Sequence, residues 1–123
     1  EAKHGDVADY MNAADLVVVP SIATRNWKEQ YGRVVPEALA CGCWLIATRV
    51  GALPELLGTH GALVPELDAD ELAIAIRRCL GTAQERRNVN ASRYALEQLS
   101  ASAQARIWDQ ALRADARSGG RAA

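Results

Sequence analysis

Two carboxylates, Glu29 and Glu37, flank the start of a predicted helix and could bind a hydroxylated ligand. Pro36 suits the first turn of a helix and Gly42 the position just past its end, so a helix is predicted from about Val34 to Cys41. An ionised carboxylate only accepts hydrogen bonds, and the hydroxyl groups of a sugar can donate them. The two glutamates therefore predict a sugar site beside the start of this helix.

Backbone N–H groups at the same helix start could bind an anion. Gly32, just before the helix, lets the backbone approach a bound group closely. The N–H groups of the first turn have no acceptor within the helix, and a helix N-terminus favours negative charge. We therefore expect a diphosphate against these N–H groups.

The same glutamates also have a purely structural interpretation. Glu37 would favour the helix dipole with no ligand present, and a pair at this separation can arise by chance among eight glutamates. The order of the surrounding segments favours a ligand site instead. A buried strand ends in Pro20-Ser21, the glutamate pair and a second strand follow, and then come Gly51-x-x-Pro-Glu55 and Gly61-x-Leu-Val.

The composition limits the classes of partner. The chain has 123 residues, half of them apolar, and a net charge of −1, which predicts one soluble α/β unit and gives no electrostatic argument for nucleic acid. The longest apolar runs, such as Leu16–Pro20, are far shorter than a membrane span, and the first residues show no secretory pattern. We expect a cytoplasmic protein, with peripheral membrane contact left open for a full-length parent.

The three cysteines, Cys41, Cys43 and Cys79, are an odd set without paired spacing. They predict neither a disulfide framework nor a zinc site, and we interpret them as buried thiols or small packing residues. We expect no metal and no cofactor.

The hydrophobic pattern predicts alternating helices and strands. Strands are expected at 16–20, 44–48 and 63–64, and helices at 6–14, 34–41, within 51–58, at 68–80, at 83–99 and from Ser100 or Ser102 onwards. Gly81 is expected to end the fourth of these helices, and Thr82 with Glu85 to begin the fifth. We expect Val89, Leu96 and Leu99 to face inward, and Ala101, Ala105, Trp108 and Leu112 to share one side of the last helix.

This order predicts an α/β fold, a Rossmann-like parallel sheet with flanking helices. Three short strands do not satisfy both sheet edges, so the chain is expected to be part of a larger domain. Residues 1–117 would form the C-terminal part of a ligand-binding lobe and 118–123 a disordered tail. The open edge and surplus apolar helix faces predict that the chain dimerises or swaps segments.

The combined pattern resembles the donor-binding lobe of the retaining glycosyltransferases with the GT-B fold, often called glycosyltransferase family 4 or group 1. The resemblance covers about Asp6 to Arg113, and its specific part is the E-x7-E motif from Glu29 to Glu37. It implies transfer of a sugar from a nucleoside diphosphate sugar to an unknown acceptor, with retention at the anomeric carbon.

The resemblance also implies roles for individual residues. Glu29 would contact hydroxyls of the donor sugar and Glu37 the nucleotide ribose, and we take both as the catalytic-site pair. The donor-binding set is completed by the residues between them: Gln30, Tyr31, Gly32, Arg33 and Val34.

The chain departs from the family pattern in several places. The family usually has a proline where this chain has Trp44, and commonly a phenylalanine where it has Tyr31. Its basic pair for the diphosphate comes from earlier strands, and its acceptor site from an N-terminal lobe. We expect both to be missing here and the chain alone to transfer no sugar.

Two other functions fit the same pattern. One is a non-catalytic α/β interaction module, in which the helices at 83–113 bind a partner. The other is a lobe of a sugar-nucleotide epimerase, which shares this architecture.

Overall fold

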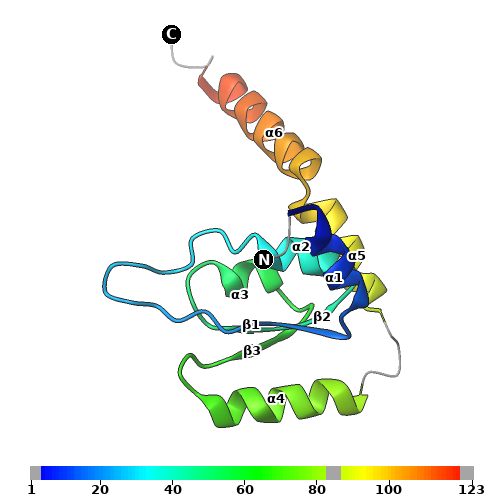
Figure 1. Cartoon of the computed structure of the whole chain (residues 1–123). Coiled ribbons are helices and arrows are strands. Elements are labelled where there is room, and N and C mark those ends of the chain that lie inside the picture. The colour runs from blue at the N-terminus through cyan, green and yellow to red at the C-terminus, as the bar shows by residue number, and fades with distance from the viewer. Residues whose placement is uncertain (1–3, 83–86, 120–123) are drawn as a thin grey trace.

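A computed structural model describes residues 4–82 and 87–119 (Figure 1). The described elements are, in chain order, the 3₁₀ turn η1 (His4–Asp6), α1 (Val7–Ala13), β1 (Leu16–Val19), α2 (Val34–Ala40), β2 (Trp44–Thr48), α3 (Leu53–Leu57), β3 (Ala62–Val64), α4 (Ala69–Thr82), α5 (Val89–Tyr94), the π-helical segment η2 (Ala95–Leu99) and α6 (Ala101–Gly119).

The three strands form one parallel sheet in the order β1-β2-β3. Val17 lies opposite Leu45, and Ala47 lies opposite Leu63. The central strand β2 is buried from Leu45 to Thr48, as expected for an apolar strand covered on both faces. The predicted α/β fold with a parallel sheet and flanking helices is confirmed.

Helices cover the two faces of this sheet. In Figure 1, α2 and α3 lie on one face and α4 on the opposite face. The side chains that are completely buried come mainly from α2, β2 and α3; the largest are Leu39, Leu45, Ile46, Leu53, Leu57, Val35 and Cys43. The core therefore sits where α2 and α3 pack against β2, and α2 also carries Glu37, the last residue of the E-x7-E segment.

The end of α4 differs from the prediction. Gly81 lies inside the helix, which continues to Thr82, because glycine weakens a helix interior without forbidding it. Thr82 therefore ends α4, and Glu85, its predicted partner in starting the next helix, lies outside the described residues.

The burial expected for the following helix is wrong in part. The helix begins after Asn88, whose side chain accepts a 3.1 Å hydrogen bond from the N–H of Ala91. Val89 and Leu96 are exposed, and Ala91 and Ala95 are buried instead. Small side chains allow α5 to approach α2 closely, and the π-helical segment η2 shifts the helical phase after Tyr94.

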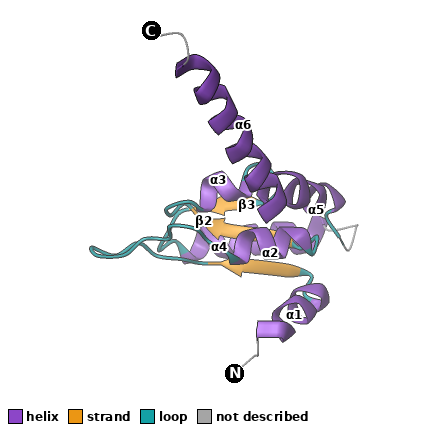
Figure 2. Ribbon diagram, turned by 90° about the horizontal axis from the view of Figure 1, so that it is seen from above, coloured by secondary structure: helices purple, strands orange, loops and turns teal. Residues whose placement is uncertain are grey.

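Ser100 begins the last helix, as one of the two predicted starts. Its hydroxyl accepts a hydrogen bond of 3.2 Å from the N–H of Ala103. The helix α6 extends to Gly119, so residues 118 and 119 are helical and do not belong to the expected tail, whose other residues lie outside the described part. Figures 1 and 2 show α6 pointing away from the sheet, and Trp108 and Leu112 are exposed on it.

None of the helices in the described part of the chain combines the length and the hydropathy needed to span a bilayer.

Candidate functional site

The loops that follow the three strands lie at the same end of the sheet (Figure 2). The longest of them, residues 20–33, is hydrogen-bonded to both of the other loops. The N–H of Ala23 donates to the carboxylate of Glu66 at 2.8 Å, and the N–H of Ala52 donates to the carbonyl oxygen of Glu29 at 3.1 Å. Ligands of open parallel sheets bind at this end, so the E-x7-E segment lies where a site is expected.

Glu29 is half-buried and its carboxylate is already hydrogen-bonded. Its Oε1 atom accepts a 2.8 Å bond from the N–H of Gly32. Gly32 has φ +55°, and a Cβ atom there would lie 2.7 Å from Cδ2 of Leu53. The backbone conformation therefore favours glycine, and a side chain there would also force the end of the Leu53 side chain to move.

Glu37 lies in the first turn of α2, as predicted, and is half-buried. Its Oε1 atom is 3.4 Å from Nη2 of Arg33. Glu37 also lines a groove between α1 and α2 with a volume of about 240 Å³, whose other walls are mainly apolar: Val7, Ala8, Met11 and Cys41. Glu29 thus lies on the loop before α2 and Glu37 in the first turn of α2, and the two carboxylates have different surroundings.

Some of the backbone N–H groups at the start of α2 already donate hydrogen bonds within the chain. Val35 donates to the carbonyl oxygen of Gly32 at 2.8 Å, and Gly32 donates to Glu29. The N–H groups of Arg33 and Val34 find no acceptor within residues 4–82 and 87–119. Of the N–H groups expected to face a diphosphate, these two are available to a ligand.

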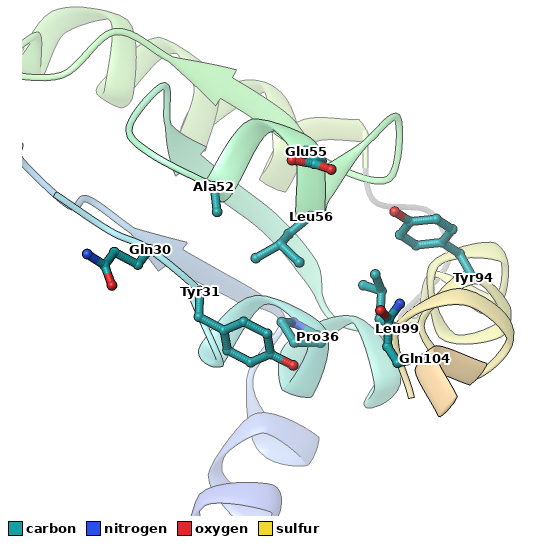
Figure 3. Close-up of a pocket in the computed structure, with 9 residues that line it drawn as sticks. All are labelled: Gln30, Tyr31, Pro36, Ala52, Glu55, Leu56, Tyr94, Leu99 and Gln104. Carbon is teal, nitrogen blue, oxygen red and sulfur yellow. The ribbon is translucent and has the colours of Figure 1, made fainter. Parts of the chain in front are cut away.

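Gln30 and Tyr31 line a cavity of about 310 Å³ on the other side of the turn (Figure 3). In Figure 3 the rings of Tyr31 and Tyr94 approach it from opposite sides, with Leu56 between them. The remaining lining residues come from α2, from α3 and the residue before it, from η2 and from α6: Pro36, Ala52, Glu55, Leu99 and Gln104. Neither Glu29 nor Glu37 lines it, so the structure separates Gln30 and Tyr31 from the glutamate pair.

One Asp-x-Asp sequence, Asp68-Ala-Asp70, stands at the start of α4. Asp68 Oδ1 accepts the N–H of Glu71 at 2.9 Å, which is a helix N-cap bond. Across the described residues, no three potential ligands among His, Cys, Asp and Glu come together as a metal site would need.

Two contacts of the site could not be anticipated from local patterns. Glu66 reaches Ala23 across 43 positions of chain, and nothing in its own neighbourhood marks it. Gly51 packs against the backbone of Glu29. The Gly-x-x-Pro-Glu pattern identified Gly51 as part of a loop at the site, but not what it touches.

Solved structures share this fold. The Anabaena protein HepE, whose crystal structure is a complex with UDP, superposes with a TM-score of 0.72 and 29% identity over 85% of this chain and 29% of that chain. Sucrose-phosphate synthase from Thermosynechococcus elongatus superposes with a TM-score of 0.67 and 33% identity over 93% of this chain and 29% of that chain.

Curated proteins are similar in sequence. The D-inositol 3-phosphate glycosyltransferase of Mycobacterium ulcerans (strain Agy99) is 41% identical over 73 residues, which are 58% of this chain and 15% of the relative. That of Mycobacterium bovis (strain BCG / Pasteur 1173P2) is 40% identical over 84 residues, 63% of this chain and 16% of the relative. The chain thus matches only about a sixth of the length of these relatives. Residues 2–82 match the family described as glycosyl transferases group 1, and the chain belongs to this family.

Proposed function

We propose that the chain is the donor-binding part of a retaining glycosyltransferase that uses a nucleoside diphosphate sugar. The observation that carries the proposal is the placement of Glu29 and Glu37 at the ligand-binding end of a parallel sheet, within the segment that matches the family. The complex of the similar Anabaena protein with UDP makes a uridine nucleotide the first candidate.

The surroundings of Glu37 suit a nucleoside. The groove beside it has apolar walls from Val7 and Met11, which fit the face of a base, and one carboxylate, which accepts hydrogen bonds from ribose hydroxyls. The present partner of Glu37 is the exposed side chain of Arg33, and exposed ion pairs contribute at most about 1 kcal/mol. A ribose could therefore replace Arg33 at little cost.

The surroundings of Glu29 suit the sugar. Its bond with Gly32 uses one oxygen of the carboxylate and leaves the other able to accept from a sugar hydroxyl. We assign Glu29 to positioning the donor and not to covalent attack on the anomeric carbon.

The free N–H groups of Arg33 and Val34 suit the diphosphate. When the glycosidic bond to the donor breaks, negative charge develops on the β-phosphate, and fixed N–H donors stabilise it in the transition state. The chain would supply only part of this stabilisation, and we expect it alone to transfer no sugar.

A non-catalytic interaction module is the second candidate, favoured by the exposed apolar residues Ile107, Trp108 and Leu112 on α6. A sugar-nucleotide epimerase would bind the same nucleotides through the same residues. Binding therefore separates the donor lobe from the interaction module, and an assay of sugar transfer against epimerisation in a longer parent separates the two enzymes.

The first experiment is a titration of the ¹⁵N-labelled chain with UDP, GDP and ADP, followed by backbone amide shifts. We expect one nucleotide to shift signals centred on residues 32–38 and Glu37→Gln to weaken its binding at least about 10-fold, since a lost bond to a charged group costs about 1.5–3 kcal/mol. The matched control is Glu71→Gln, in the first turn of α4 on the opposite face of the sheet. No shift with any nucleotide would contradict the donor-lobe proposal.

A further inference from the structure

We infer that Gly51, in the loop after β2, is a positioning residue that sets the place of the Glu29 carboxylate. The inference rests on the proposed function, because it assigns the purpose of this placement to donor binding. Gly51 meets Glu29 through the backbone and has no side chain that could bind a ligand.

The two backbones approach each other more closely than a side chain would permit. A Cβ atom on Gly51 would lie 1.7 Å from the carbonyl oxygen of Glu29, 2.7 Å from its carbonyl carbon and 3.2 Å from its Cα atom. Since backbone atoms cannot rotate away as the end of a side chain can, any other residue at this position must displace Glu29. The φ of +54° at Gly51 also favours glycine.

The contact is fixed from the Gly51 side. Val50 and Leu53 flank the turn and are buried in the core. The N–H of Val50 donates to the carbonyl oxygen of Thr48 at 2.9 Å, and the N–H of Leu53 donates to that of Val50 at 3.1 Å. Because this turn is anchored in the core and the loop carrying Glu29 is on the surface, a clash between them moves Glu29.

Glu29 is held at both ends by hydrogen bonds that depend on this approach. Its carbonyl oxygen accepts from the N–H of Ala52 at 3.1 Å, and its Oε1 atom accepts from the N–H of Gly32 at 2.8 Å. Gly32 in turn packs on Leu53 and Leu56, in the helix that starts directly after the Gly51 turn. The Gly51 turn thus fixes both the backbone of Glu29 and the position of Gly32, whose N–H group donates to the Glu29 carboxylate.

The test compares Gly51→Ala with Gly58→Ala. Gly58 has the same φ of +54°, but a Cβ atom there would meet nothing closer than Oη of Tyr94 at 3.7 Å. Both variants therefore place a side chain at the same positive φ, and only one of them clashes with Glu29. The readout is the amide proton of Gly32, whose chemical shift reports its bond to the carboxylate, with Glu29→Ala as the reference for a lost bond.

We expect the Gly32 signal of Gly51→Ala to move toward that of Glu29→Ala, and the signal of Gly58→Ala to stay in place. We also expect Gly51→Ala to weaken the binding of UDP-glucose, whose sugar hydroxyls Glu29 would contact, at least about 10-fold more than Gly58→Ala, and to change the binding of UDP itself less. A Gly32 signal that is unchanged in Gly51→Ala would overturn the inference.

A second measurement covers the case in which Gly51→Ala does not fold. Scalar couplings across hydrogen bonds in the unsubstituted chain should connect Ala52 N with the Glu29 carbonyl carbon, and Gly32 N with the Glu29 carboxyl carbon. Absence of either coupling would refute the placement. These signals need no nucleotide, so failure of UDP to bind the unsubstituted chain would contradict the proposed function alone.

Discussion

Nη1 of Arg87 donates a 3.2 Å hydrogen bond to the carbonyl oxygen of Ala14, across 73 positions of chain. The same guanidinium group reaches the carbonyl oxygens of Met11 and Asn12 at the end of α1. The last carbonyl groups of a helix have no partner within it, and a cation there also complements the helix dipole. Arg87 therefore fastens the segment after α4 to the end of α1.

Replacing Arg87 should destabilise the fold. We expect Arg87→Ala to lower the free energy of unfolding by about 1.5–3 kcal/mol, the usual contribution of hydrogen bonds from a charged group. Urea unfolding followed by circular dichroism measures the change. The control is Arg77→Ala, on an exposed face of α4, and equal stability of the two variants would show that the Arg87 contacts contribute nothing.

Replacing a core leucine by alanine should destabilise the fold far more than replacing a surface leucine. Leu45 is completely buried on β2, and Leu96 is 61% exposed on η2. We expect Leu45→Ala to cost about 2–5 kcal/mol through the lost transfer energy and the cavity it leaves, and Leu96→Ala less than about 0.5 kcal/mol. Chemical denaturation of both variants measures these changes. A large loss of stability in Leu96→Ala would show that Leu96 is buried, as the sequence pattern predicted, and would contradict its exposure in the structure.

The thiol of Cys43 predicts a dependence of stability on pH. Its Sγ atom is 3.0 Å from the carbonyl oxygen of Met11, and burial raises the pKa of this thiol, an effect that nearby Arg87 partly offsets. The unfolded chain loses this proton first, above about pH 8.5, whereas the folded chain retains it. The contribution of the protonated Cys43 thiol to the free energy of unfolding is therefore complete below that pH and is lost as the pH rises.

We expect the free energy of unfolding to fall between about pH 7 and pH 10 less steeply in Cys43→Ala than in the unsubstituted chain. Cys79, whose pKa is also raised by burial, is present in both chains and cancels in this comparison. In the native chain, the half-exposed Cys41 should react with a thiol reagent well before Cys43. Equal slopes in the two chains would remove Cys43 as the source of the pH dependence.

The sequence was most informative where one residue type has one physical explanation. The apolar run at 44–48 could only be a buried strand in this order of elements, and it is β2. Pro36 and Gly42 placed α2 to within one residue at its end. The face of α5 and η2 could not be predicted, because a π-helical segment changes the helical phase and nothing in the sequence near Tyr94 signals it.

The sequence predicted which residues form the site but not which atoms they contact. Spacing placed Glu29 and Glu37 near the start of α2, and the structure adds that Glu29 bonds to Gly32 while Glu37 faces Arg33. The role of Gly51 depends on how two loops meet in space, which local sequence does not encode. Arg87 is invisible for the same reason, since its partners are backbone carbonyl groups.

The pair of Arg33 and Glu37 should contribute little to stability. With side chains that are 66% and 40% exposed, a double-mutant cycle of Arg33→Ala and Glu37→Gln is expected to give a coupling of about 0.3–0.5 kcal/mol. The cycle is measured by urea unfolding in low salt and should shrink in high salt. A coupling above about 1 kcal/mol would mean that a ribose cannot easily replace Arg33, which would weaken the proposed role of Glu37.

The exposed stripe on α6 predicts self-association of this chain. Ile107, Trp108 and Leu112 are 49%, 66% and 66% exposed, on a helix that points away from the sheet. Pairing of two such stripes would remove apolar surface from water at about 25 cal/mol per Å². We expect the average mass in light scattering to rise with concentration, and Trp108→Glu to abolish the rise. Gln110→Glu adds the same charge to the same helix at another exposed position and should leave it intact. A monomer at every concentration would show that the stripe does not pair with a second copy of itself.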